Sequence, residues 1–219
     1  MELGDLLVKI ANNARLTPQE LDVLKRIGNE TQQRNNFVAG NTSPQNTLDI
    51  NFPFFPIYSQ SLESPTSSIT VTIPSGLSNV IIMGSMRTDA ASFNDTIGVR
   101  FNGDSGANYR TMFEGAQNTT QIATQNTSAT YYGIGTSTGA NATSGSHGNF
   151  LTYITNVYGN AWKSVLSIAG TSEYSASDVL TLLNSGHWKN TTPISTMQFF
   201  STSGANLVAG CLLSIYGIR

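Results

Sequence analysis

The stretch Val99-Arg100-Phe101-Asn102-Gly103-Asp104-Ser105-Gly106-Ala107-Asn108-Tyr109-Arg110 decides how the chain around it folds. Asn102-Gly103 offers two residues that readily take positive φ, which a tight type I′ turn requires. The flanking apolar residues, Val99 and Phe101 before the turn and Tyr109 and Met112 after it, suit strands that face a core. The stretch therefore predicts the tip of a β-hairpin in a protein built of antiparallel strands.

Further strands are predicted on both sides of this tip. Residues 68–74 alternate between isoleucine or valine and threonine, with Ile69, Val71 and Ile73 facing inward. Residues 79–86 predict a strand that is fully buried in its middle. Residues 115–148 are poor in apolar side chains and predict mostly loop, with Gly133–Gly139 as a flexible turn and short strands at 119–125 and 130–136. Later strands are predicted at 97–101, 109–114, 150–158, 163–169, 187–189, 194–200 and 212–218. The chain is thus expected to be mainly β, an antiparallel jelly-roll-like β-sandwich preceded by a short N-terminal helical arm.

The segment Phe52-Pro53-Phe54-Phe55-Pro56-Ile57-Tyr58 leads into this sandwich. Its prolines cannot donate to a sheet ladder, so the segment predicts an edge strand or a wrapping segment and not a central strand. Its aromatic rings either cover one end of the core or contact a neighbouring subunit, and both alternatives stay open.

The first 45 residues differ from the rest because charged residues are concentrated there. Helical spacing of leucines predicts one amphipathic helix near residues 2–14, and the capping box Thr17-Pro18-Gln19-Glu20 predicts the start of a second. Residues 1–45 are therefore interpreted as a helical assembly or anchoring arm with a linker, and residues 46–219 as the β-sandwich domain. The apolar stripes either pack against other copies or another protein, or they fold back onto the chain's own β domain. Their residues are Leu3, Leu6, Leu7, Ile10, Leu21, Leu24 and Ile27.

Two segments carry a resemblance to a known family. Asn102-Gly103-Asp104 followed by Asn108-Tyr109, together with the ending Gly210–Arg219 that contains Tyr216 and Gly217, resembles β-sandwich structural proteins of tailed-bacteriophage virions. Capsid decoration (cement), head-fibre and tail-fibre proteins belong to this group. The resemblance implies a virion protein that is made in the host cytoplasm and released by lysis, and a closing strand that lies inside the sandwich.

Within that resemblance, the expected function is a homotrimeric capsid decoration or head-fibre protein. Its partners would be copies of itself and another virion protein, such as the major capsid protein or a tail component. The alternative is a tail-associated receptor- or carbohydrate-binding protein that contacts a host surface glycan. In that alternative four aromatic residues would stack on sugar rings, namely Tyr131, Tyr132, Trp162 and Trp188.

The composition excludes several classes of protein. With 11 Lys plus Arg and a net charge of −2, the chain has no basic patch for nucleic acid. No apolar stretch is long enough for a membrane helix, and the acidic start shows no secretory signal. The single cysteine, Cys211, lies in an apolar run and is expected to be buried. Neutral polar residues dominate instead, which suits a surface that packs against many identical copies.

Catalytic chemistry has little support in the sequence. Neither His147 nor His187 has a second metal ligand at a suitable spacing. Four acidic residues of the β region match no calcium loop and are interpreted as solvated carboxylates: Asp89, Asp95, Asp104 and Glu114. We therefore expect no enzyme activity, no metal and no cofactor.

Overall fold

The structure is a computed structural model that describes Thr17, residues 54–172 and residues 179–219. The chain divides into two units, Met1–Thr47 and Leu48–Arg219. Apart from Thr17, the described residues belong to the second unit. The helical arm and its leucine stripes lie outside the described residues, so the arm and the boundary near residue 45 stay predictions.

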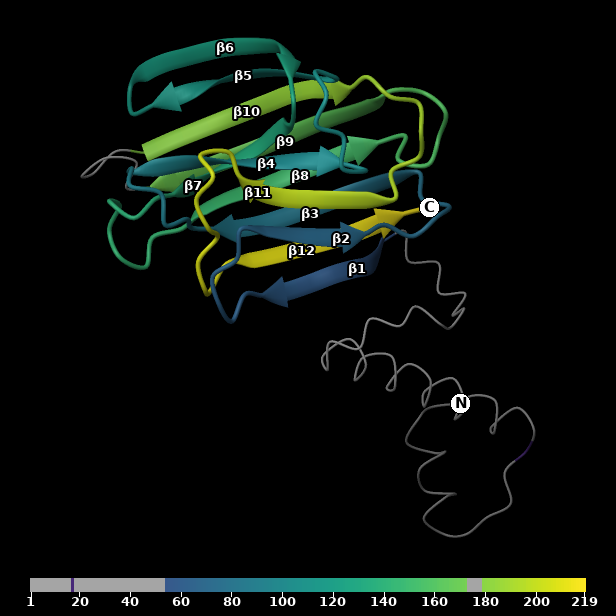
Figure 1. Cartoon of the computed structure of the whole chain (residues 1–219), viewed down its shortest axis with the longest axis horizontal. Helices are drawn as coiled ribbons and strands as arrows, with labels where there is room; N and C mark the ends of the chain where they lie inside the picture. The colour runs from purple at the N-terminus through teal and green to yellow at the C-terminus, as the bar shows by residue number, and fades with distance from the viewer. Residues whose placement is uncertain (1–16, 18–53, 173–178) are drawn as a thin grey trace. The chain divides into compact units, whose positions relative to one another are not determined.

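The second unit consists of two antiparallel β-sheets (Figure 1). The larger sheet has eight strands in the order β1-β12-β3-β8-β9-β10-β5-β6, and the smaller has four in the order β2-β11-β4-β7. This confirms a mainly β fold. The strands of the described residues are β1 (Phe54–Ser61), β2 (Ser68–Thr72), β3 (Asn79–Met86), β4 (Asn94–Phe101), β5 (Tyr109–Gln117), β6 (Thr120–Ala129), β7 (Tyr132–Thr138), β8 (Gly148–Thr155), β9 (Lys163–Ser172), β10 (Val179–Trp188), β11 (Thr196–Ser201) and β12 (Leu212–Ile218).

Eight of these strands form nested pairs. β1 pairs with β12, β2 with β11, β3 with β8, and β4 with β7. In sequence, the pairs β1·β12 and β2·β11 enclose the pairs β3·β8 and β4·β7. The first part of the chain therefore pairs antiparallel with later parts in reverse order. The pairs β1·β12 and β3·β8 lie in the large sheet, and the pairs β2·β11 and β4·β7 form the small sheet.

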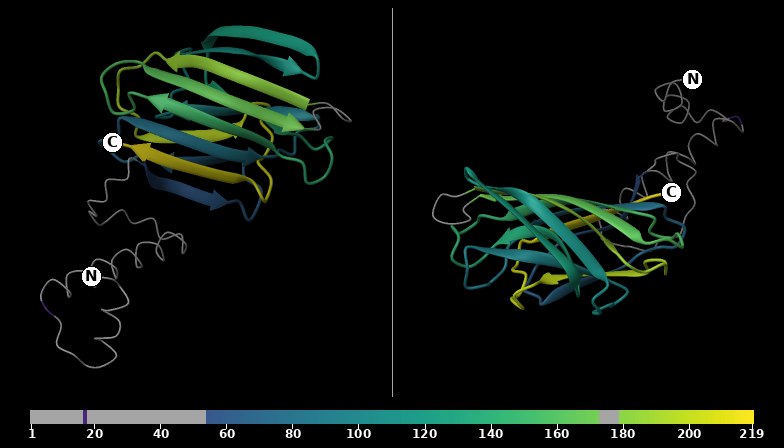
Figure 2. Two further views of the ribbon diagram at one scale, coloured as in Figure 1. Left: turned by 180° about the vertical axis from the view of Figure 1, so that it is seen from behind. Right: turned by 90° about the horizontal axis from the view of Figure 1, so that it is seen from above.

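The remaining four strands are two inserted hairpins, β5-β6 and β9-β10. β5 pairs with β10, so the two hairpins join side by side and extend the large sheet past the small one. Figure 2 shows this extension rising beyond the edge of the sandwich. The large sheet therefore has an inner face that the small sheet covers only in part.

The core lies between the two sheets, where inward-facing side chains of both sheets interdigitate. Strand β7, at the edge of the small sheet, packs over β8 and β9 of the large one. The largest fully buried side chains include Trp188, Tyr109, Tyr132 and Phe101. This cluster of aromatic residues gives a neutral, Ser- and Thr-rich chain enough apolar burial for a stable fold.

Several sequence predictions are confirmed. Ile69, Val71 and Ile73 are buried while the threonines between them are exposed, as the alternating pattern requires. β1, which contains Phe55 and Pro56, is an edge strand. The closing strand β12 lies inside its sheet between β1 and β3. Cys211 is buried, and its thiol donates to the carbonyl oxygen of Arg87 at 3.2 Å.

The predicted hairpin at Asn102-Gly103 is wrong. Both residues do take positive φ, 53° and 68°, and the amide of Asp104 donates to the carbonyl of Phe101 as in a tight turn. However, β4 belongs to the small sheet and β5 to the large one, so the strands on either side of the turn do not pair. The turn is a corner at which the chain crosses between sheets.

Three further predictions about the strands are wrong. Residues 115–148 are mostly strand and not mostly loop, because they hold the end of β5 together with β6 and β7. The short strands predicted at 119–125 and 130–136 do overlap β6 and β7, which are longer than expected. β6 is polar because it is an edge strand exposed on both faces. Gly133–Gly139, interpreted as a flexible turn, falls largely within β7. The middle of β3 is not fully buried, since Met83 is exposed on the outer face of the large sheet.

The first testable prediction concerns the junction of the two inserted hairpins. A Cβ on Gly186 of β10 would overlap the carbonyl oxygen of Arg110 on β5. Because the obstacle is backbone, Gly186→Ala should destabilise the fold by about 1–3 kcal/mol in urea denaturation followed by circular dichroism. The matched control is Gly170→Ala in β9, where the nearest atom to a new Cβ lies at 3.4 Å. An equal loss of unfolding free energy in both variants would contradict the close approach of β10 and β5 at Gly186.

Candidate functional site

The motif that carries the family resemblance forms the corner between β4 and β5. The side-chain oxygen of Asn102 accepts hydrogen bonds from the amides of Ser195 and Thr196 at 2.8 and 3.1 Å. Its amide nitrogen donates to the carbonyl of Pro193 at 2.8 Å. Asn102 therefore ties the corner to the start of β11, and its role here is structural.

Asp104 is the centre of a second set of bonds. Its carboxylate accepts from the indole Nε1 of Trp188 at 2.7 Å, from Asn108 Nδ2 at 2.9 Å and from the amide of Gly106 at 2.8 Å. Burial alone would raise the pKa of Asp104, but these donors outweigh it and hold that pKa below its ordinary value. Asp104 is thus an ionised structural acceptor. The sequence-based interpretation of this residue as a solvated carboxylate is wrong.

Tyr109 completes the corner. Its hydroxyl donates to the carbonyl of Asp104 at 3.1 Å and accepts from the amide of Phe101 at 3.0 Å. Its ring stacks on Trp188, with ring centroids 6.2 Å apart, and Phe101 packs against both. Burial raises the pKa of Tyr109, so this phenol stays protonated and holds the corner together. Of the motif residues, the structure brings together Asn102, Gly103, Asp104, Asn108 and Tyr109.

The other motif residues, Tyr216 and Gly217, lie apart from the corner, on β12. Gly217 is buried, and a Cβ there would lie 2.7 Å from the ring of Phe55 on the neighbouring β1. Tyr216 is half-buried and opposite Ile81 of β3. The two halves of the motif are therefore separate packing sites.

The aromatic residues proposed for sugar stacking separate into two groups. Trp188 and Tyr132 are buried in the core, so they are not available to a ligand. Trp162 is 54% exposed and stacks on His187 at a centroid distance of 5.2 Å. Tyr131 is half-buried, and its ring meets that of Phe200 edge to face. The carbohydrate-binding alternative therefore depends on Tyr131 and Trp162 alone.

The described residues offer little support for other candidate chemistry. Gly135-Thr136-Ser137-Thr138-Gly139 has the spacing of a hydrolase nucleophile elbow, but Ser137 is buried and its hydroxyl donates to the carbonyl of Asp95. The carboxylate of Asp95 accepts from Ser203 at 2.9 Å, and that of Asp89 from Asn206. Within the described ranges no three His, Cys, Asp or Glu side chains are placed to hold a metal. The same residues include no helix with the length and apolarity to cross a membrane.

The outer face of the large sheet carries the most unusual surface of the described residues. Met83, Leu151, Ile168 and Leu183 lie opposite one another across β3, β8, β9 and β10. Beside this row, Tyr153 lies opposite Leu166, and Met112 follows on β5. All are large apolar side chains exposed to solvent; Ile168, for example, is 55% exposed. We name this surface the outer patch and define it as Met83, Met112, Leu151, Tyr153, Leu166, Ile168 and Leu183.

Charge around the outer patch is confined to one of the described strands that carry it, β5. In the described strands β12, β3, β8, β9 and β10 no outward-facing position holds Asp, Glu, Lys or Arg. On β5, however, Arg110 and Glu114 flank Met112, and Glu114 lies opposite Leu183. The outer face of the small sheet differs, because it presents Thr70, Thr72, Gln198 and Arg100. Contiguous exposed apolar surface of this kind marks sites of protein–protein contact.

The sequence interpretation did not find the outer patch, although a signal was present. Apolar runs such as Val80–Met83 and Phe150–Ile154 have apolar residues on both faces of their strands. In an antiparallel sheet with one solvent face, the outward positions are normally polar. The first of these runs instead predicts a strand that is buried in the chain's own core, and the second predicts a strand only.

Comparisons with known proteins give little. No model of a known protein family matches the chain, and no curated protein matches it either. A similar solved structure is the CBM2 module of the evolved Dit of Lactobacillus casei BL23 phage J-1. It is 13% identical over 77% of this chain and 81% of that chain, with a TM-score of 0.17. A TM-score this low carries no argument about the fold or the function of this chain.

A second testable prediction concerns Asp104. All three of its partners donate hydrogen bonds to the carboxylate. An asparagine at this position would replace one accepting oxygen by an NH₂ group, which is itself a donor and cannot accept from them. Asp104→Asn should therefore lower the free energy of unfolding by about 1–3 kcal/mol in urea denaturation. Glu63→Gln, at an exposed carboxylate, is the matched control and should change it by less than about 0.5 kcal/mol. A stability unchanged in Asp104→Asn would refute the role given to this carboxylate.

A third prediction follows from the lowered pKa of Asp104. Because the folded state holds this carboxyl's pKa below 3.8, the unfolded chain takes up its proton first as the pH falls. The stabilisation is complete above pH 3.8 and is lost as the pH falls through the folded-state pKa. Asp89 acts in the same direction, since bonds from Asn206 lower its pKa too. The free energy of unfolding, measured by urea denaturation at a series of pH values, should therefore fall less with decreasing pH in Asp104→Asn than in the wild type. Parallel plots of this free energy against pH for the two proteins would contradict the prediction.

Proposed function

We propose that this chain is a non-enzymatic structural protein that assembles with copies of itself through the outer patch. The observation that carries the proposal is the contiguous apolar surface on the outer face of the large sheet, where the only charged residues on the described strands that carry the patch are Arg110 and Glu114 of β5. Identical copies can bring together the part of this surface on β3, β8, β9 and β10 without placing like charges opposite one another. Burying exposed leucine and isoleucine side chains contributes about 25 cal/mol per Å² of apolar area removed from water.

We further propose that the assembly belongs to a tailed-phage virion, as a homotrimeric capsid decoration or head-fibre protein. This finer assignment is supported by the resemblance of Asn102–Tyr109 and of the ending Gly210–Arg219 to that family. The leucine stripes of the predicted arm would add contacts to other copies or to a second virion protein. The absence of a catalytic role is part of the same proposal.

We also assign the sandwich to the jelly-roll type, in which eight strands form two sheets wound from paired strands. The nested pairs β1·β12, β2·β11, β3·β8 and β4·β7 support this assignment. The hairpins β5-β6 and β9-β10 are then insertions into a jelly roll of eight strands.

A fourth prediction tests the assembly. Ile168→Lys places a charge in the middle of the outer patch, on a side chain already exposed in the single chain. The full chain should be a trimer by native mass spectrometry and light scattering, and Ile168→Lys should be a monomer with an unchanged circular dichroism spectrum.

The matched control is Phe93→Lys, because Phe93 is also an exposed apolar residue but precedes β4 of the small sheet. This variant should remain a trimer. A monomeric wild-type chain, or an Ile168→Lys variant that stays oligomeric, would refute assembly through the outer patch.

A further inference from the structure

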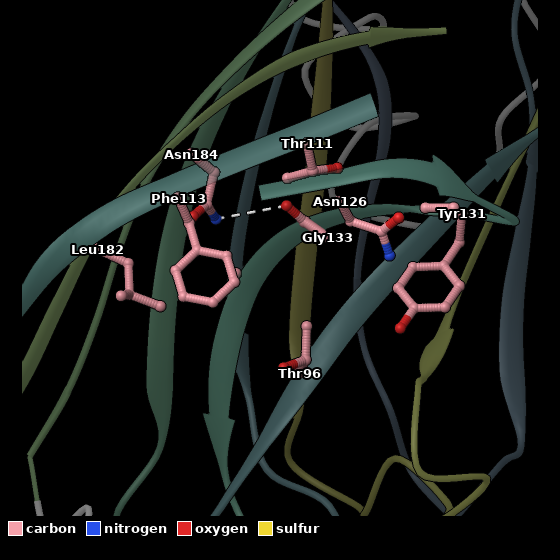
Figure 3. Close-up of a pocket in the computed structure, with 10 residues that line it drawn as sticks. Thr96, Thr111, Phe113, Asn126, Tyr131, Gly133, Leu182 and Asn184 are labelled. Carbon is pink, nitrogen blue, oxygen red and sulfur yellow. Dashed lines mark hydrogen bonds between the residues drawn. The ribbon is translucent and has the colours of Figure 1, made fainter. Parts of the chain in front are cut away.

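A cavity of about 160 Å³ lies where the inserted hairpins extend the large sheet past the edge of the small sheet (Figure 3). Its walls come from β5, β6 and β10 of the large sheet and from β4 and β7 of the small one. This is the inner face of the extension, on the opposite side of the large sheet from the outer patch. The cavity is therefore independent of the proposed assembly surface.

Two polar atoms of residues that line this cavity have no hydrogen-bond partner within the described residues. They are Oδ1 of Asn184 on β10 and Oγ1 of Thr111 on β5. Both residues are buried, with 4% and 8% of their surfaces exposed. The Asn184 side chain is oriented by its Nδ2, which donates to the carbonyl of Gly133 at 3.3 Å, as Figure 3 shows. Buried polar groups without partners destabilise a fold, so a pair of them in one cavity needs an explanation.

The rest of the lining defines what could pair with these atoms. None of the residues that line the cavity is charged. Phe113 and Leu182 supply an apolar wall, and Tyr131 supplies an aromatic ring that is half-buried. A suitable ligand is therefore neutral, donates a hydrogen bond to Asn184 Oδ1, pairs with Thr111 Oγ1, and has an apolar face for the rings.

We infer that this cavity binds one neutral sugar ring, with hydroxyl groups on Asn184 and Thr111 and a C–H face against the aromatic side chains. A pyranose combines donors, acceptors and an apolar face within one small ring, which is the combination that the lining demands. The ring is either a free monosaccharide or the terminal unit of a glycan, and both present the same groups.

The chain offers a matched pair of variants for the test. Thr88 is a second buried threonine whose Oγ1 has no partner within the described residues, and it is not part of the cavity lining. Replacing either threonine by valine removes an unpaired hydroxyl with little change of shape. Both Thr111→Val and Thr88→Val should therefore raise the melting temperature of the sugar-free protein.

The experiment titrates the full chain with the methyl glycosides of glucose, galactose, mannose and N-acetylglucosamine. Saturable NMR shifts are expected at the amides of Phe113 and Gly133 for at least one glycoside. Thr111→Val should bind it about tenfold more weakly, as should Asn184→Leu, while Thr88→Val should bind like the wild type. An oligosaccharide ending in the same sugar separates the two sources: equal binding identifies a glycan end, and binding of the small glycoside alone identifies a free sugar.

The inference is overturned if no glycoside shifts the cavity amides of the wild type, or if Thr111→Val binds as tightly as Thr88→Val does. Because Thr111→Val is nearly isosteric, it keeps the test decisive even if Asn184→Leu fails to fold. A monomeric protein that still binds the sugar would refute assembly and leave the cavity proposal standing.

Discussion

The hydrogen bond from Trp188 to the carboxylate of Asp104 is the contact on which the two-sheet arrangement depends most. Asp104 follows β4 of the small sheet, and Trp188 ends β10 of the large sheet. The bond therefore joins the sheets at the point where the chain crosses between them. Phe101, Tyr109 and Trp188 pack around it, so the corner also fixes the largest aromatic cluster of the core. A charged acceptor suits this position because several neutral donors converge on it.

The second constraint is the two-sided apolar character of the large sheet. Its inward residues pack against the small sheet, while outward residues such as Leu151 and Ile168 face solvent in the single chain. Polar residues on that outer face would fold equally well, since the core does not include it. Keeping apolar side chains there carries an aggregation risk, which a partner that covers the face would remove. A closed assembly of identical copies meets this requirement.

Local signals in the sequence predicted local structure well. The alternation of Ile69, Val71 and Ile73, the positive φ of Asn102 and the edge position of β1 all follow from residue types over short windows. Strand partners did not follow, because a turn fixes where the chain reverses and not which strand lies beside it. The corner at Asn102-Gly103 has the chemistry of a hairpin turn, and it is Asp104 that directs the chain to the other sheet. The candidate sites were missed for the same reason: whether Ile168 is exposed, or Thr111 unpaired, is decided by distant strands.

One topological event accounts for both uncovered surfaces. The hairpins β5-β6 and β9-β10 add four strands to the large sheet and none to the small one. The outer face thereby gains Ile168, Leu183 and Met112, which widen the apolar surface of that face. The inner face gains Thr111 and Asn184 at a position that the small sheet reaches through its edge strand β7 and Thr96 of β4. In an eight-stranded sandwich without the insertions, neither the wide patch nor the cavity would exist. The insertions therefore supply the surfaces on which both proposals rest, while the nested pairs and the Asp104 corner hold the sandwich that carries them.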